Sequence, residues 1–114
     1  MITDSAKEKV ISLLDDSLNE GMFGTSDQAA SADDTELIAE LTSTVKTISG
    51  SQSGKQLLIT YNILSTEGNG NTFKEYGNDL TNGTSDVLLN RVVFTDLPKT
   101  NALEVQVKTL LQVN

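Results

Sequence analysis

The chain has 114 residues, enough for one domain with one core, and sixteen Asp and Glu against eight Lys and Arg give a formal net charge of −8. It contains no Cys and no His, which excludes disulfides, thiolate chemistry, imidazole bases and the usual zinc and iron ligands. The negative charge argues against nucleic acid and anionic membranes as partners, and no apolar run approaches the ~20 residues that cross a bilayer. We therefore expect no cofactor, no membrane anchor and no secretion signal.

Residues 4–20 have the pattern of an amphipathic helix. Its start is either Ser5, with Glu8 three positions later as a capping box, or Asp4, and Gly21 ends it. The apolar stripe of this helix either covers the domain's own core or docks on a partner subunit. The candidate docking residues on the stripe are Val10, Leu14 and Leu18.

Residues 21–41 predict a mobile loop followed by a short helical segment. The stretch 24–34 holds Thr, Ser, Ala, Asp and Gln and almost no large apolar side chain, so it cannot bury enough surface to offset its ordering entropy. Thr35–Leu41 can form a helical turn, because Leu37, Ile38 and Leu41 share a face.

Residues 43–114 predict an antiparallel β-sandwich of jelly-roll type. Apolar residues alternate with polar ones most clearly in 103–113, and a second strand is expected at 57–64. Further strands are expected at 45–49, 72–77 and 87–94, with turns at 50–54, 67–71 and Asn82-Gly83. Short loops without intervening helices favour antiparallel pairing. The fold class is therefore mainly β, a sandwich preceded by one helix, in a single domain spanning 1–114.

No set of side chains predicts catalysis or a metal site. The acidic pairs at 15–16 and 33–34 look solvated, whereas a catalytic pair needs one buried carboxyl. Glu67, Asn69, Asn71 and Asp79 carry the oxygen ligands that calcium prefers, but their spacing fits no EF-hand and a turn explains them equally well. Tyr76 is a possible platform for stacking a sugar. We expect a protein that is not an enzyme.

Arg91 is the only arginine, and it lies in an expected strand rather than in a basic patch. A guanidinium on a strand needs a partner, and Glu75 lies on the strand expected beside it. We expect Arg91 to pair with Glu75 or with another carboxylate across neighbouring strands.

The order of these motifs resembles a family of small structural proteins of tailed bacterial and archaeal viruses. After the opening helix come a Gly-Thr loop with acids, a Leu- and Glu-bearing segment, a Gly/Asn turn, a Glu-aromatic-Gly step, a Leu-Xaa-Arg strand, Lys-Thr and a final alternating strand. Their counterparts are Gly24-Thr25 with Asp33-Asp34-Thr35, Leu37–Leu41, Glu67-Gly68-Asn69-Gly70, Glu75-Tyr76-Gly77, Leu89-Asn90-Arg91, Lys99-Thr100 and residues 103–113. Many relatives continue after the Glu-aromatic-Gly step with an apolar pair, where this chain has Asn78-Asp79, so the local strand is expected to end early.

The resemblance implies a virion structural protein, assembled in the host cytoplasm, from the tail fibre, baseplate, neck or capsid surface. Its partners would be copies of itself and other virion proteins, with a trimer favoured because virions repeat their parts by closed symmetry. The alternative is a receptor- or carbohydrate-binding β-sandwich, in which loops 25–34 and 65–71 grip a ligand and a host surface receptor is the partner.

Overall fold

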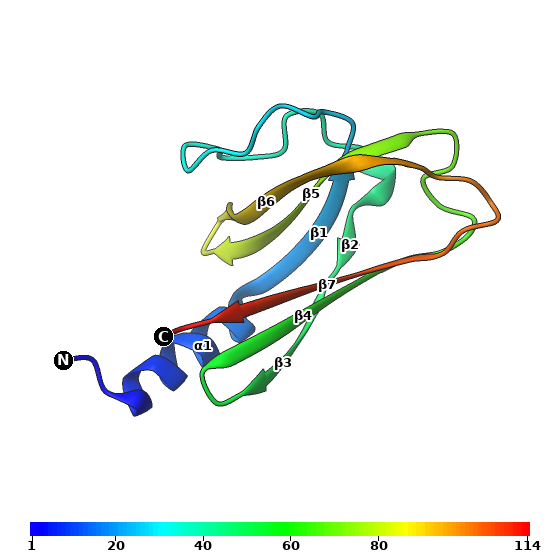
Figure 1. The fold of residues 1–114 in the computed structure, drawn as a ribbon. Helices are drawn as coiled ribbons and strands as arrows, with labels where there is room; N and C mark the ends of the chain where they lie inside the picture. The colour runs from blue at the N-terminus through cyan, green and yellow to red at the C-terminus, as the bar shows by residue number, and fades with distance from the viewer.

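The structure is a computed structural model that describes all residues, 1–114, as one helix and seven strands in two sheets (Figure 1). Both sheets are antiparallel, so the predicted class, a mainly β sandwich after one N-terminal helix, is confirmed. Helix α1 spans Asp4–Ser17, and a short 3-10 helix, η1, spans Thr42–Thr44. The four-stranded sheet has the order β2-β1-β5-β6, and its strands are Lys46–Thr47, Leu18–Gly24, Thr72–Asn82 and Ser85–Pro98. The three-stranded sheet has the order β3-β4-β7, and its strands are Ser49–Ser53, Gln56–Ile63 and Val105–Gln112.

An aromatic cluster fills the space between the two sheets. Phe23 of β1 is at its centre, stacked on Phe73 at 4.2 Å between ring centroids and in edge contact with Tyr61 and Tyr76. All four rings are almost fully buried. Rings at these separations add to the hydrophobic gain of burial, so the core fixes how the sheets face each other.

Helix α1 is shorter than the predicted range 4–20. Thr3 caps it by accepting a hydrogen bond from the backbone N–H of Ala6, in place of the expected Ser5 or Asp4, and the helix ends at Ser17. From Leu18 the chain is extended as β1, which pairs with β5 on one side and β2 on the other. Leu18 continues the helical spacing of the apolar stripe, so only the long-range pairing reveals the strand.

The segment expected as a mobile loop with a helical turn also differs. It is strand up to Gly24, and then residues 25–41, called the strap from here on, cross the outer face of the four-stranded sheet (Figure 1). No helix forms at 35–41, and the short 3-10 helix follows at Thr42–Thr44. The strap is fastened by hydrogen bonds to buried side chains, which a composition of small polar residues does not reveal.

The expected strand 45–49 is divided between the two sheets. β2 pairs with β1, Ile48 is buried, and β3 then pairs with β4, so the chain passes from one sheet to the other here. The segments expected at 72–77 and 87–94 form one long hairpin, so the strand after Gly77 does not end early.

Two of the three predicted turns lie where they were expected, at 67–71 and at Asn82-Gly83, whereas the turn predicted at 50–54 is wrong because Ser49–Ser53 is strand β3 and only Gly54-Lys55 turns. Gly68, Gly70 and Gly83 all have positive φ, which glycine adopts without a steric penalty. Gly83 closes the hairpin of β5 and β6, and the two other glycines shape the connection from β4 to β5.

Candidate functional site

The ends of the strap are joined by backbone hydrogen bonds. Thr25 N–H donates to Ala39 O at 3.0 Å, and Leu41 N–H donates to Phe23 O at 2.9 Å. The strap therefore leaves the sheet and returns to it at almost the same point, in the manner of a compact surface loop.

Both ends of the strap are held by Glu75 of β5, whose side chain is fully buried beneath it. Its carboxylate accepts hydrogen bonds from the backbone N–H groups of Ser26, Ile38 and Ala39, at 2.9 to 3.1 Å. Burial alone would raise the pKa of the Glu75 carboxyl, but the bonds from Arg91 and from these backbone groups outweigh it, so the pKa lies below its ordinary value. Glu75 is therefore a buried anion that binds both ends of the strap.

Arg91 of β6 completes this arrangement, and the predicted pairing of Arg91 with Glu75 is confirmed. Arg91 Nε donates to Glu75 Oε1 at 2.8 Å, diagonally across the strand pair, because Arg91 itself lies opposite Gly77. The other two guanidinium nitrogens reach the strap, donating to Gln28 O at 2.8 Å and to Asp34 Oδ2 at 3.3 Å. We call Glu75 and Arg91 together the clasp, because nearly all their polar atoms serve to fasten the strap.

Two glycines allow the strap to lie this close to the sheet. A Cβ on Gly24 would lie 2.4 Å from Glu75 Oε2 and 2.6 Å from the backbone oxygen of Ala39. A Cβ on Gly77 would lie 2.8 Å from the buried Leu37 of the strap. Both positions thus need a residue without a side chain for reasons of space.

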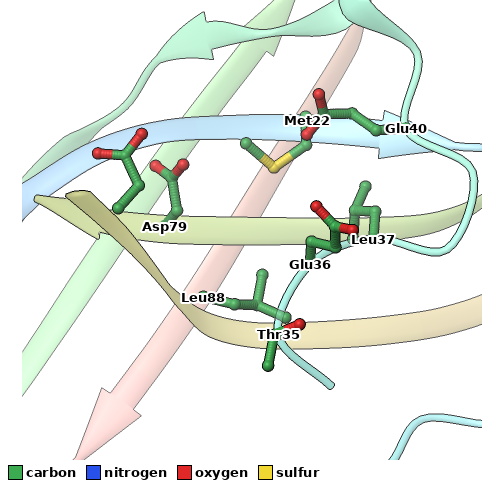
Figure 2. Close-up of a pocket in the computed structure, with 8 residues that line it drawn as sticks. Met22, Thr35, Glu36, Leu37, Glu40, Asp79 and Leu88 are labelled. Atoms are coloured by element: carbon green, nitrogen blue, oxygen red, sulfur yellow. The ribbon is translucent and has the colours of Figure 1, made fainter.

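An acidic pocket lies between the strap and the four-stranded sheet (Figure 2). The cavity measures about 210 Å³ and is lined by Met22, Thr35, Glu36, Leu37, Glu40, Asp79, Asp86 and Leu88. Figure 2 shows Thr35 to Glu40 on the strap, with Met22 and Asp79 on the sheet across from them. The pocket therefore brings carboxylates from three separate parts of the chain together.

Two carboxyl groups of the pocket, those of Asp79 and Glu40, have a raised pKa. Burial raises the pKa of Asp79, and the nearby charge of Asp86 raises it further. Burial likewise raises the pKa of Glu40, with a further rise from Asp79 and the other acids around it. Each of these acids is harder to ionise in the folded protein than in a free peptide.

The trio Glu20, Asp79 and Asp86 has carboxylate oxygens within 4.8 Å of one another and could hold a hard cation such as calcium. The backbone N–H of Glu20 already donates to Asp79 Oδ1 at 2.7 Å, which gives this oxygen a partner within the protein. Exposed acidic groups of this kind are common without a metal. The sequence pointed only to Asp79 among these three residues, because the distances along the chain between residues 20, 79 and 86 match no known ligand motif.

The fold does not bring together the four residues that the sequence offered as possible calcium ligands. Asp79 is in the acidic pocket, whereas Asn69 of the turn at 67–71 accepts a hydrogen bond from the ammonium group of Lys99. Lys99 is buried, and its Nζ donates to Asn69 Oδ1 at 2.7 Å and to the backbone oxygens of Ser65 and Thr100. A lysine thus supplies the positive charge of this turn.

The predicted docking stripe on the helix is split between the core and the surface. Leu14 and Leu18 pack against the core cluster, and Ile11 is fully buried in it. Val10 is 45 % exposed, next to the exposed Leu13. The helix therefore covers its own domain's core, the first of the two interpretations, and only Val10 of the three candidates faces outward.

An apolar groove opens between the edge strands β6 and β7, where the two sheets are not hydrogen-bonded to each other. It measures about 210 Å³ and is lined by Phe23, Tyr76, Val92, Phe94, Leu97, Val105 and Val107. Tyr76 is only 1 % exposed and belongs to the core cluster, so it packs as an aromatic residue on a strand is expected to, and the alternative role as a sugar platform is wrong. The groove is the most apolar depression of the molecule.

Comparisons with family models, with curated proteins and with solved structures found no match to this chain. No helix of the structure combines the length and the apolar character needed to cross a membrane. Inferences about function therefore rest on the geometry described above and on the resemblance of the motifs.

Proposed function

We propose that this chain is a structural protein of a tailed-virus particle and that it acts by assembling with copies of itself and with other virion proteins. The observation that carries the assembly part is the apolar groove between two unpaired edge strands. Its lining is entirely apolar, and Val92 at its rim is 46 % exposed. Exposed apolar surface beside free strand edges is typical of a surface that another polypeptide covers.

The clasp supports the same function. Two buried charges fix the strap. Burying charges costs desolvation free energy, so their use here indicates that the shape of the loop matters. A loop held in one shape can form part of a repeated contact without losing further entropy on assembly. The resemblance of the motifs supplies the viral setting, and the number of copies, expected to be three, stays a prediction.

The test has two parts. Light scattering of the purified chain across a range of concentrations measures whether it assembles. Immunogold labelling of purified virus particles, with an antibody against this chain and an unrelated antibody as control, measures whether it is part of the virion and where it lies. Particles that carry no label and no peptide of this chain in mass spectrometry overturn the viral function.

The second candidate is a receptor- or carbohydrate-binding module, and the observation in its favour is the pocket beneath the strap. Sugar hydroxyls donate hydrogen bonds to carboxylates such as Glu36 and Asp86. None of the residues that line the pocket is aromatic, which weakens this candidate because sugars commonly stack on exposed rings. Binding on a glycan array that Glu36→Gln abolishes would support it over the structural function.

A further inference from the structure

We propose that the start of strand β7 pairs with the start of β7 of a second copy, antiparallel over residues 104–108 about a two-fold axis through Gln106, so that the two three-stranded sheets join into one sheet of six strands. This inference deepens the proposed assembly function and rests on it, because it names a contact between copies, and it puts a two-fold pair in place of the expected trimer.

β7 is the long edge strand that has neither a bulge nor a proline. It pairs with β4 over eight consecutive residues without a register shift, and it contains no proline. β6, the other long edge, has two irregularities in its pairing with β5 and ends in Pro98. Bulges and proline are devices that keep an edge from pairing with another chain, whereas a straight regular edge is a template for it.

The remaining edges are short or have a neighbour. β2 has two residues. β3 lies beside helix α1, where Gln52 Nε2 donates to Glu8 O and Ser12 Oγ donates to Gln52 Oε1. β7 is therefore the long edge that is left for a partner.

The sequence of β7 and the residue before it is complementary to itself. A two-fold axis at Gln106 places Glu104 of each copy opposite Lys108 of the other, which gives two cross-strand ion pairs. On the same face the two Gln106 side chains meet at the axis. Moving the two-fold axis by two residues in either direction places Glu104 opposite Glu104, or Lys108 opposite Lys108, and moving it by one residue leaves both charges opposite neutral residues, so the axis at Gln106 is the one that forms the ion pairs.

The other face of the pairing covers the apolar groove. Val105 and Val107 line the groove, and in this register Val105 of each copy lies opposite Val107 of the other. The second β7 thus extends the apolar wall on the side where the groove is open. A second copy fits because the same strand supplies the free edge, the charges of opposite sign and the apolar face.

A single cysteine tests the register directly, since the chain has none of its own. Gln106→Cys places two thiols opposite each other at the axis, and mild oxidation should give a disulfide-linked dimer at high yield. Gln112→Cys is the matched control, because its two copies would lie roughly 40 Å apart along the paired strands. Equal cross-linking of the two variants, or none at position 106 under conditions where the chain associates, would overturn the pairing.

Charge reversal tests the contact independently. Glu104→Lys or Lys108→Glu should raise the dimer dissociation constant at least about tenfold by making both pairs repulsive, and the double variant should restore it. Lys9→Glu makes the same change of charge on the exposed face of the helix and should have no effect. Both β7 positions are exposed, so circular dichroism should be unchanged.

The oligomeric mass separates this inference from the proposed function. A mass of two chains that falls to one in the single reversals supports the β7 pairing. A trimer whose mass the reversals leave unchanged overturns the pairing and leaves the assembly function standing. A monomer at all concentrations overturns the pairing, while the labelling of particles decides the function.

Discussion

Glu75 and Arg91 are joined by a hydrogen bond of 2.8 Å, and their side chains are 0 % and 1 % exposed. The pair lies beneath the strap rather than within the apolar core, and its remaining polar atoms bind strap residues. A charge left alone at this depth would have no water to stabilise it. The stability of the fold and the shape of the strap therefore depend on the same two side chains.

Breaking the clasp from either side should be costly. Glu75→Gln and Arg91→Met should each lower the free energy of unfolding by roughly 3 kcal/mol, because Glu75→Gln leaves buried Arg91 with only the more distant carboxylate of Asp34 and Arg91→Met leaves buried Glu75 with no cation. The double variant should lose less than the sum of the two, since neither charge then remains. Urea unfolding of the three variants measures this, and strictly additive losses would contradict the coupling.

The same variants should loosen the strap locally. In Glu75→Gln the amide hydrogens of Ser26, Ile38 and Ala39 lose part of their acceptor, so their exchange with solvent should become faster than in the native chain. Amides in the middle of β4 serve as the internal control. Breaking the exposed pair of Lys55 and Asp4 should leave strap exchange unchanged and stability within about 1 kcal/mol.

Gly24→Ala should destabilise the protein by roughly 1 to 3 kcal/mol, because the new methyl group overlaps Glu75 Oε2 and Ala39 O and neither can move freely. Gly83→Asn is the control. Its turn has a positive φ that Asn tolerates and no atom within 4 Å of the added Cβ, so its effect should be smaller. Thermal melting of both variants makes the comparison, and equal losses would show that the space between strap and sheet is not the cause.

Sequence reasoning predicted the local features and the one cross-strand pair. Alternating side chains at 57–64 and 103–113 predict strands whose two faces differ in exposure. Asn82-Gly83 is a residue pair typical of a tight hairpin turn. The pairing of Arg91 with Glu75 could be predicted because a single arginine on a strand has few partners available. These features depend on residues that are near in the chain or on adjacent strands.

The remaining features depend on contacts between distant segments. Strand β1 begins at Leu18, which also continues the helical stripe, and the choice between the two is made by β5, some sixty residues later. The strap is fastened by its backbone N–H groups, which every residue but proline possesses and which leave no mark in the sequence. The acidic pocket likewise gathers residues 36, 40, 79 and 86 without a recognisable spacing.

Lys99→Met should unfold the turn before β5 at lower denaturant than the rest of the molecule. The ammonium group of this buried lysine has three oxygen acceptors, and a thioether in its place leaves them without a donor. We expect this to lower the free energy of unfolding by roughly 2 kcal/mol. Lys74→Met, on a half-buried side chain for which no ion pair is found, serves as the control. Urea unfolding followed by exchange at the amide of Gly70, which donates to Lys99 O, distinguishes local from global loss.

Removing one negative charge from the acidic pocket should make the protein more stable at neutral pH. Asp79 has a raised pKa in the folded state, so folding favours its protonated form, and the ionised form opposes folding at any pH well above the folded pKa. Asp79→Asn keeps an oxygen for the N–H of Glu20 and should raise the free energy of unfolding at pH 7 by roughly 0.5 kcal/mol.

The pH dependence of this gain identifies its cause. The gain should be constant above the folded pKa of Asp79 and should vanish as the pH falls through that value towards the ordinary 3.8, because the native side chain is then neutral as well. Glu75 acts in the opposite sense, since its lowered pKa means that its stabilisation is present at neutral pH and is lost in acid. Thermal melting of native, Asp79→Asn and the exposed control Asp96→Asn between pH 3 and 8 measures both trends. A gain from Asp79→Asn that persists at pH 3 would mean that charge repulsion is not its origin.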